Sequence, residues 1–256
     1  MGASILRQRP DVVFLDVGDT LVRAHPSWAA VYRQGLTDCG IEVGEEELEA
    51  ALLEETKHGG WWLTEHPFDP TEEESFARIK QFDSLVLARL GHPDLPDDAF
   101  RAIEAAFARR AAWHVYPDVE PAVRALRDAG LRLAVISNWV WGGPELMHDL
   151  ELARHFEVLV ISARVGFQKP HEGIFRLALE RMRVEPARAV HVGDSYAADV
   201  LGARRVGIAP VLIDRQAADF ARVRDERSDP DLPIVRDLFE LLDLMGVDRP
   251  AGAAVS

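Results

Sequence analysis

Four apolar residues, Val12 to Leu15, run directly into Asp16, and a turn that contains Gly18 follows at once. A continuous apolar run bounded by turn residues predicts a strand that is buried on both faces, as in a parallel sheet. Open α/β sheets bind their ligands at the carboxyl ends of the strands, which is where Asp16 lies. From this stretch alone, Asp16 is either the cap of a turn or a functional carboxylate.

The pattern of a buried strand followed by polar groups recurs later in the chain. Apolar runs at 131–136 and 189–192 end in Ser137-Asn138 and in Gly193-Asp194, and Lys169 lies in a loop before the second of these runs. Further strands are predicted at 158–161 and 210–213, and helices at 119–129, 144–150, 172–182, 196–206 and 235–245. Strands that alternate with helices predict an α/β fold with a doubly wound parallel sheet.

A helical segment interrupts this alternation between the first strand and residue 116. Helical spacing of apolar residues predicts helices at 28–39, 45–57, 71–90 and 97–113, with an irregular loop at 58–70 and no strand between Leu21 and Tyr116. We therefore expect a catalytic core of residues 1–21 and 116–256, with residues 22–115 inserted as a helical cap.

Charge and cysteine content restrict the partners. Forty-three acidic against twenty-nine basic residues give a net charge of −14, which disfavours nucleic acid and anionic membranes as partners. No apolar run approaches the roughly 20 residues of a membrane span. Cys39 is the only cysteine, so an intrachain disulfide and a cysteine-rich zinc site are excluded. We expect a cytoplasmic location; the oligomeric state has no signal in the sequence.

The residues at the predicted strand ends suit phosphate chemistry. Asp16 and Asp194 are hard oxygen ligands that, with a backbone carbonyl, can hold Mg²⁺. A carboxylate beside that ion can also act as a nucleophile on phosphorus. Ser137, Asn138 and Lys169 offer donors for phosphoryl oxygens.

Four ordered motifs, FLDVGDTL, LRLAVISN, GFQKPHEGIF and VHVGDSYAADVLGARRVG, together resemble the haloacid dehalogenase (HAD) superfamily of hydrolases. The resemblance extends from Phe14 to Gly207 and is greatest to the helical-cap branch, which includes the haloacid dehalogenase-like hydrolase domain-containing proteins. It implies a small phosphorylated substrate and a mobile cap that carries substrate choice. The resemblance implies that Asp16 is the nucleophile and that Mg²⁺ is bound by Asp16, the Gly18 carbonyl and Asp194. It implies that Asp199 is a carboxylate near the metal. The residues implied to bind phosphate are Thr20, Ser137, Asn138 and Lys169.

One position departs from the family pattern. HAD phosphatases usually carry an acid/base aspartate two residues after the nucleophile, where this chain has Gly18, followed by Asp19. On an extended segment, Asp19 would point to the opposite side. Loss of a positioned acid/base costs about 10²–10⁴-fold in rate. Three readings stay open: a Mg²⁺-dependent phosphatase, a weakened phosphate- or partner-binding protein, and a 2-haloacid dehalogenase.

Several other side chains are weaker candidates. His25 could supply the missing acid, whereas His171 and His191 are expected to be structural. Aromatic and histidine side chains of the insertion either pack or line a substrate pocket. These are Trp61, Trp62, His66, Trp113 and His114.

Overall fold

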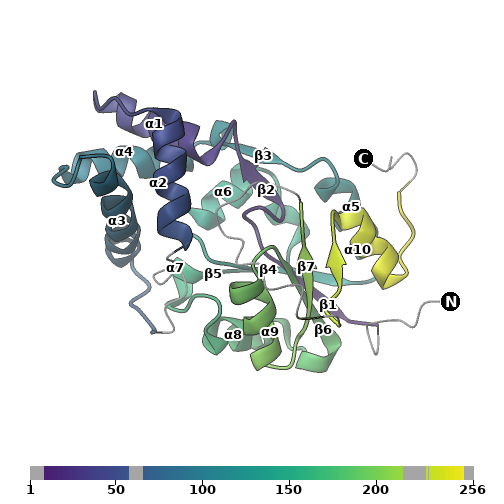
Figure 1. Ribbon diagram of the computed structural model, residues 1–256. Helices are drawn as coiled ribbons and strands as arrows, with labels where there is room; N and C mark the ends of the chain where they lie inside the picture. Colours follow the sequence, from purple (N-terminus) through teal and green to yellow (C-terminus); the bar gives the residue numbers. More distant parts are fainter. Residues whose placement is uncertain (1–8, 58–65, 216–228, 230, 251–256) are drawn as a thin grey trace.

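Six parallel strands form the central sheet of the computed structural model, which describes residues 9–57, 66–215, 229 and 231–250. Their order is β5-β4-β1-β6-β7-β8, so the strand that ends at Asp16 lies inside the sheet (Figure 1). The predicted doubly wound α/β fold is confirmed. The strands are β1 (Val12–Leu15), β4 (Arg132–Ser137), β5 (Val158–Ile161), β6 (Ala189–Gly193), β7 (Ala209–Ile213) and β8 (Ile234–Val235).

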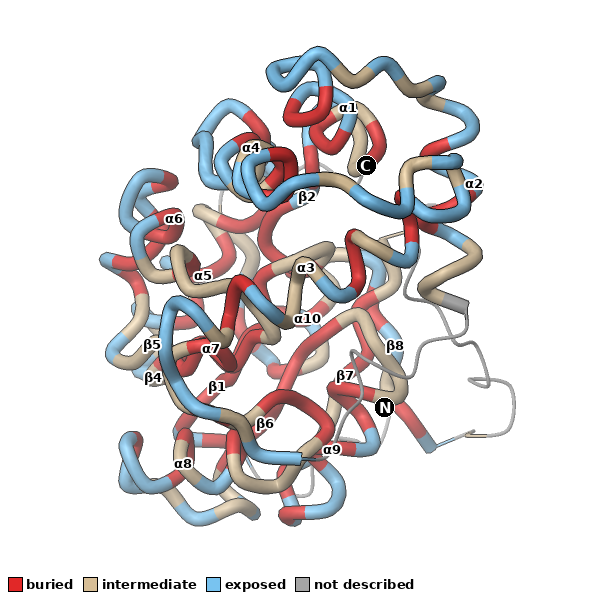
Figure 2. The backbone as a smooth tube through the Cα atoms, turned by 90° about the vertical axis from the view of Figure 1, so that its left-hand side faces the viewer, coloured by how far each residue is buried: buried red, intermediate tan, exposed pale blue. Residues whose placement is uncertain are grey.

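Both faces of the sheet are covered, as the continuous apolar character of β1 requires. Val13 and Leu15 pack into a core shared with helices α5 (Val119–Asp128) and α10 (Leu238–Met245). Val12 and Phe14 pack on the opposite side with α8 (Glu172–Met182) and α9 (Leu201–Arg205). Burial is continuous along β1 and β6 (Figure 2). A buried central strand gives Asp16 a rigid support.

The helices formed by the described residues of the insertion gather on one side of the sheet (Figure 1). They are α1 (Trp28–Asp38), α2 (Glu45–Lys57), α3 (Glu72–Arg89) and α4 (Asp97–Ala108). Ser27 and Thr71 cap α1 and α3 by accepting hydrogen bonds from backbone N–H groups, as their residue types predict. These helices share an apolar core of their own. The division into two domains at these boundaries stays a prediction.

The expectation that the insertion contains no strand is wrong. β2 (Val22–Ala24) pairs antiparallel with β3 (Trp113–Val115), and a 3₁₀ turn at Arg110–Ala112 ends the helical stretch early. Each strand has three residues, too few for an alternating pattern to be readable. Tertiary pairing between the two ends of the insertion creates them.

Smaller differences occur in the core. The chain forms a short helix α7 (Ser162–Val165) after β5, a strand β8 and a π-helical turn at Tyr196–Val200, none of which was predicted. Asp237 accepts a hydrogen bond from Glu240 N and so starts α10 later than expected. Among the residues that the structure describes, no helix has the length and apolar character needed to cross a bilayer.

Candidate active site

The carboxyl ends of the central strands bring the predicted site residues to one edge of the sheet. β1 pairs in parallel with β4 and with β6, and Leu15 lies opposite both Val135 and Val192. Asp16 follows Leu15, while Ser137 and Asp194 follow those partners by two residues. Parallel register therefore places these three residues together, although they are far apart in the sequence.

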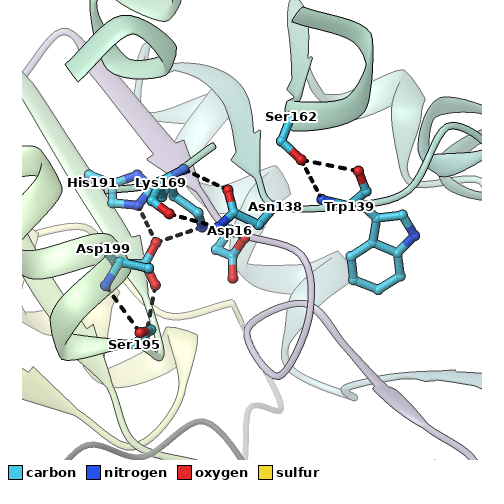
Figure 3. A network of polar contacts seen from close by, with 9 residues as sticks. Asp16, Asn138, Trp139, Ser162, Lys169, His191, Ser195 and Asp199 are labelled. Atoms are coloured by element: carbon cyan, nitrogen blue, oxygen red, sulfur yellow. Dashed lines mark hydrogen bonds and ion pairs between the residues drawn. The ribbon is translucent and has the colours of Figure 1, made fainter. Parts of the chain in front are cut away.

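Lys169 is the centre of the polar network at this edge (Figure 3). Its Nζ lies 2.7 Å from Asp16 Oδ1 and 2.6 Å from Asp199 Oδ1, and its side chain is 2% exposed. Burial alone would lower the pKa of Lys169, but the carboxylates of Asp16 and Asp199 raise it above the ordinary value of lysine. The lysine is therefore a permanent positive charge beside Asp16.

Asn138 holds the loop that carries this lysine. Its Nδ2 donates to the Lys169 carbonyl at 2.9 Å, and its Oδ1 accepts from the Lys169 backbone N–H at 2.7 Å. The peptide bond between Lys169 and Pro170 is cis. Both ends of the Asn138 amide are thus engaged with the backbone, so the geometry gives it a positioning role. Its predicted contact with substrate stays a prediction.

Asp199 is the counter-ion of Lys169, and three donors fix it. Oδ1 accepts from Lys169 and from His191 Nε2 at 2.7 Å, and Oδ2 accepts from the Ser195 backbone N–H at 3.0 Å. Burial would raise the pKa of Asp199, but Lys169 and His191 lower it below the usual range. A Cβ atom on Gly193 would lie 2.2 Å from Asp199 Cγ, so only glycine fits at that position. Sequence reasoning missed the His191 link; a polar residue inside an apolar strand was its one signal.

Three carboxylates form an acidic cluster at the carboxyl ends of the central strands. Each of Asp16, Asp194 and Asp199 offers an oxygen that lies within 4.8 Å of the others. Burial, and then the charges of Asp16, Asp19 and Asp199, raise the pKa of Asp194 well above its ordinary value. Burial also raises the pKa of Asp16, although Lys169 and the nearby Ser137 hydroxyl act against it.

A divalent cation would offset this repulsion and keep the carboxylates ionised. Hard oxygen donors suit Mg²⁺. Since the oxygens of Asp199 already accept hydrogen bonds from three groups, Asp16 and Asp194 are the carboxylates that remain for an ion. A cavity opens at this edge of the sheet, and Asp16, Asp194 and Gly18 all lie on its wall. The carbonyl of Gly18 is the predicted third ligand.

The turn after Asp16 corrects one expectation. Asp19 has a φ of 50°, in the left-handed region, so the segment is not extended there. Asp19 consequently lies on the cavity wall instead of pointing away from it. Trp139, which sequence reasoning did not single out, packs against Gly18.

The remaining candidates divide clearly. Thr20 and Ser137 are buried and do not line the cavity described here, so their contact with phosphate stays a prediction. Trp113 lines the cavity. His25, His66 and His114 are exposed and are absent from that wall, which disfavours His25 as the missing acid. Trp61 and Trp62 lie outside the described residues.

Residues 10–207 match the family described as haloacid dehalogenase-like hydrolase, which covers most of the chain and all the strand ends discussed above. The chain belongs to the haloacid dehalogenase-like hydrolases. The predicted resemblance is therefore confirmed, and this HAD protein is a hydrolase by family.

Named relatives support the same placement. Phosphoserine phosphatase of Thermus thermophilus is 36% identical over 256 residues, which cover 89% of this chain and 97% of that protein. Glyceraldehyde 3-phosphate phosphatase of Methanopyrus kandleri is 31% identical over 243 residues, which cover 91% of this chain and 96% of that protein. The mouse haloacid dehalogenase-like hydrolase domain-containing protein 3 is 37% identical over 145 residues, or 56% of this chain and 58% of that protein. A HAD phosphatase structure from Thermococcus onnurineus superposes with a TM-score of 0.61 at 25% identity, covering 94% of this chain and 100% of that one.

Proposed function

We propose that this HAD hydrolase is a Mg²⁺-dependent phosphatase that acts on a small phosphorylated metabolite through an aspartyl-phosphate intermediate. The observation that carries the proposal is the placement of Lys169 Nζ between Asp16 and Asp199, 2.7 and 2.6 Å from their oxygens. A buried ammonium beside a candidate nucleophile suits a dianionic phosphate group. The phosphatase names of two relatives support the same reaction class.

In the proposed reaction, an Asp16 oxygen attacks phosphorus while the bond from phosphorus to the organic oxygen breaks. The departing oxygen takes a proton from solvent. Water then attacks the same phosphorus, the bond to Asp16 breaks, and inorganic phosphate leaves. Lys169 and Ser137, which both lie beside Asp16, would hold the phosphoryl oxygens through both steps. Asn138 would keep the lysine loop in place.

Asp16, Asp194 and the Gly18 carbonyl would hold Mg²⁺, with Asp199 nearby as the carboxylate that fixes Lys169. When bound, the ion supplies charge neutralisation for the phosphoryl group. The mutual closeness of the carboxylates and the raised pKa of Asp194 support this ligand set. We propose that the protein works in the cytoplasm.

A second function deserves the same test because Gly18 occupies the acid/base position. It is a weakened HAD protein that binds phosphate or a partner with little turnover. Dehalogenation of a 2-haloacid is a third reading, which an acidic cluster suited to a cation disfavours.

Phosphate release from a panel of phosphorylated metabolites with Mg²⁺ tests the proposal, with Asp16→Asn as the control. Release that is abolished by Asp16→Asn supports the phosphatase. Equal release by both proteins rejects Asp16 as nucleophile. A rise in melting temperature with Mg²⁺ and phosphate, without turnover of any compound, selects the binding protein instead, and halide release in EDTA selects the dehalogenase.

A further inference from the structure

A cavity of about 310 Å³ extends from the edge of the sheet at which Asp16 and Lys169 lie into the helical insertion. Asp16, Lys169 and Asp194 lie on its wall at one end, and side chains of α1, α3 and α4 lie on its wall at the other. This volume is at the lower end of the range for small-molecule sites. A phosphate group at Asp16 would therefore have its organic part in the space between sheet and insertion.

One wall of this cavity is a run of aromatic rings in successive contact. From the sheet edge, Trp139 lies 4.8 Å from Trp113, and Trp113 lies 5.4 Å from Trp28, as measured between ring centroids. Trp28 then contacts Phe107 at 5.4 Å, and Phe107 contacts Tyr32 at 5.0 Å. All five rings line the cavity. Such a wall suits a flat or apolar group and leaves the hydroxyls of a polyhydroxylated group unbonded.

The aromatic wall ends at a buried carboxylate. Tyr32 Oη donates to Asp83 Oδ1 at 2.6 Å, and Asp83, which is 1% exposed, also lines the cavity. Within the described part of the chain, Tyr32 is the hydrogen-bond partner of Asp83. Because the pKa of Asp83 is raised to about 7, Oδ2 is a free acceptor above that pH, where the carboxyl is ionised. Glu104 lies on the same wall and adds negative charge there. A buried acceptor of this kind favours a ligand that brings a donor.

We infer that this cavity binds the leaving group of the substrate and that the leaving group is an apolar, largely flat alcohol. The alcohol would pack against the aromatic wall formed by Trp139, Trp113, Trp28, Phe107 and Tyr32. At its far end it would carry a hydroxyl or ammonium group that donates a hydrogen bond to Asp83. The inference deepens the proposed function and rests on it for the position of the phosphate. It separates this chain from an enzyme built for short, highly polar phosphate esters.

Matched phosphate esters, assayed at pH 8 where Asp83 is ionised, test the inference. The substrates are phenylethyl phosphates whose para substituent is ethyl, hydroxymethyl or aminomethyl, with glycerol phosphate as the polar comparison. All are primary alkyl esters, so they differ little in intrinsic reactivity, and the three substituents are nearly equal in size. Wild-type kcat/KM should be highest for the aromatic esters that end in a donor, by about 10-fold or more over the ethyl ester, and the difference should appear mainly in KM.

Asp83→Asn should remove most of the preference for the aminomethyl ester. Glu73→Gln, which changes an exposed carboxylate at the start of the same helix α3, should keep it. Phe107→Leu gives a second, independent measurement, because it shortens the aromatic wall without touching Asp83. It should lower kcat/KM for all three aromatic esters by a larger factor than kcat/KM for glycerol phosphate.

Failure of the inference and failure of the phosphatase proposal give different results. Asp16-dependent release that favours glycerol phosphate, or a preference for the aminomethyl ester that survives Asp83→Asn, overturns the inference and leaves the phosphatase. If no ester releases phosphate, binding of the aminomethyl alcohol is measured by calorimetry. Binding that is lost in Asp83→Asn then supports the cavity assignment without the phosphatase, and equal or absent binding overturns it.

Discussion

A Cβ atom on Gly18 would lie 3.0 Å from Cζ3 of the Trp139 ring. The indole of the residue that follows Asn138 therefore occupies the space beside the position where most HAD phosphatases carry their acid/base aspartate. The large side chain of Trp139 thus fills space beside the small residue Gly18, and a carboxylate at position 18 would collide with the indole.

This pairing predicts a coupled effect of substitutions. Gly18→Asp should lower the free energy of unfolding by about 1–3 kcal/mol, because the new side chain overpacks against the indole. Trp139→Phe removes the outer ring and should reduce that cost in the double variant. Urea unfolding of all four proteins measures the coupling energy, and strictly additive losses would refute the pairing.

Asp83 predicts a pH-dependent stability in the insertion. Burial, partly offset by the hydrogen bond from Tyr32 and reinforced by Glu104, raises the pKa of Asp83 to about 7. Because this folded-state pKa lies above the unfolded value, protonation stabilises the fold. The contribution is fully present below about pH 4 and is lost as the pH rises through 7.

Asp83→Asn has no such titration, so its stability relative to wild type should increase from pH 5 to pH 8. The expected change is on the order of a few kcal/mol. Denaturant melts of the two proteins at both pH values measure it. An identical difference at pH 5 and pH 8 would show that Asp83 does not titrate in this range.

Lys169 predicts a strong electrostatic coupling in the core. Lys169→Met would leave Asp16 and Asp199 buried without their shared cation, which should cost about 3–5 kcal/mol of unfolding free energy near neutral pH. Adding Asp199→Asn to this variant should restore part of the loss. If the double variant is less stable than wild type by the sum of the losses in the two single variants, the ion pair between Lys169 and Asp199 is not the source of the loss.

Magnesium should stabilise the folded protein through Asp194. At a concentration 100 times the dissociation constant, binding to one site adds about 2.7 kcal/mol to the free energy of unfolding, which is a rise of several degrees in melting temperature. Asp194→Asn should lose most of this rise. Asp128→Asn, an exposed change on α5, should retain it. Equal shifts in all three proteins would place the ion elsewhere.

Helix packing in the insertion depends on Gly35. A Cβ atom there would lie 2.6 Å from Ile103 Cα, on the backbone of α4, which cannot move aside as a side chain can. Gly35→Ala should therefore destabilise the protein by about 1–3 kcal/mol. Gly142→Ala is the matched control, since nothing lies within 4 Å of its Cβ position, and it should be neutral or slightly stabilising. Thermal melts that rank the two variants in the opposite order would contradict this packing.

The α/β class and the residues at the strand ends could be predicted from the amino-acid sequence. Local patterns carry that information: the apolar run before Asp16 and the alternation of strands and helices need no distant contact to be read. Helix starts at Ser27 and Thr71 were readable for the same reason, because a cap is made within one turn.

Which side chains come into contact could not be predicted from local patterns and follows from the folded arrangement. The pairing of β2 with β3, the hydrogen bond from His191 to Asp199, the contact of Trp139 with Gly18 and the aromatic path to Asp83 each join residues whose partners no local pattern specifies. They depend on how the insertion packs over the sheet and on how the core folds. Packing buries Asp83, which raises its pKa. The fold of the core places Asp16 and Asp199 beside Lys169, and these two carboxylates raise the pKa of the lysine against the effect of its burial. The position of Asp16 at the end of a buried strand can be read from the sequence, whereas the shape and charge of the space that faces it exist only in the folded chain.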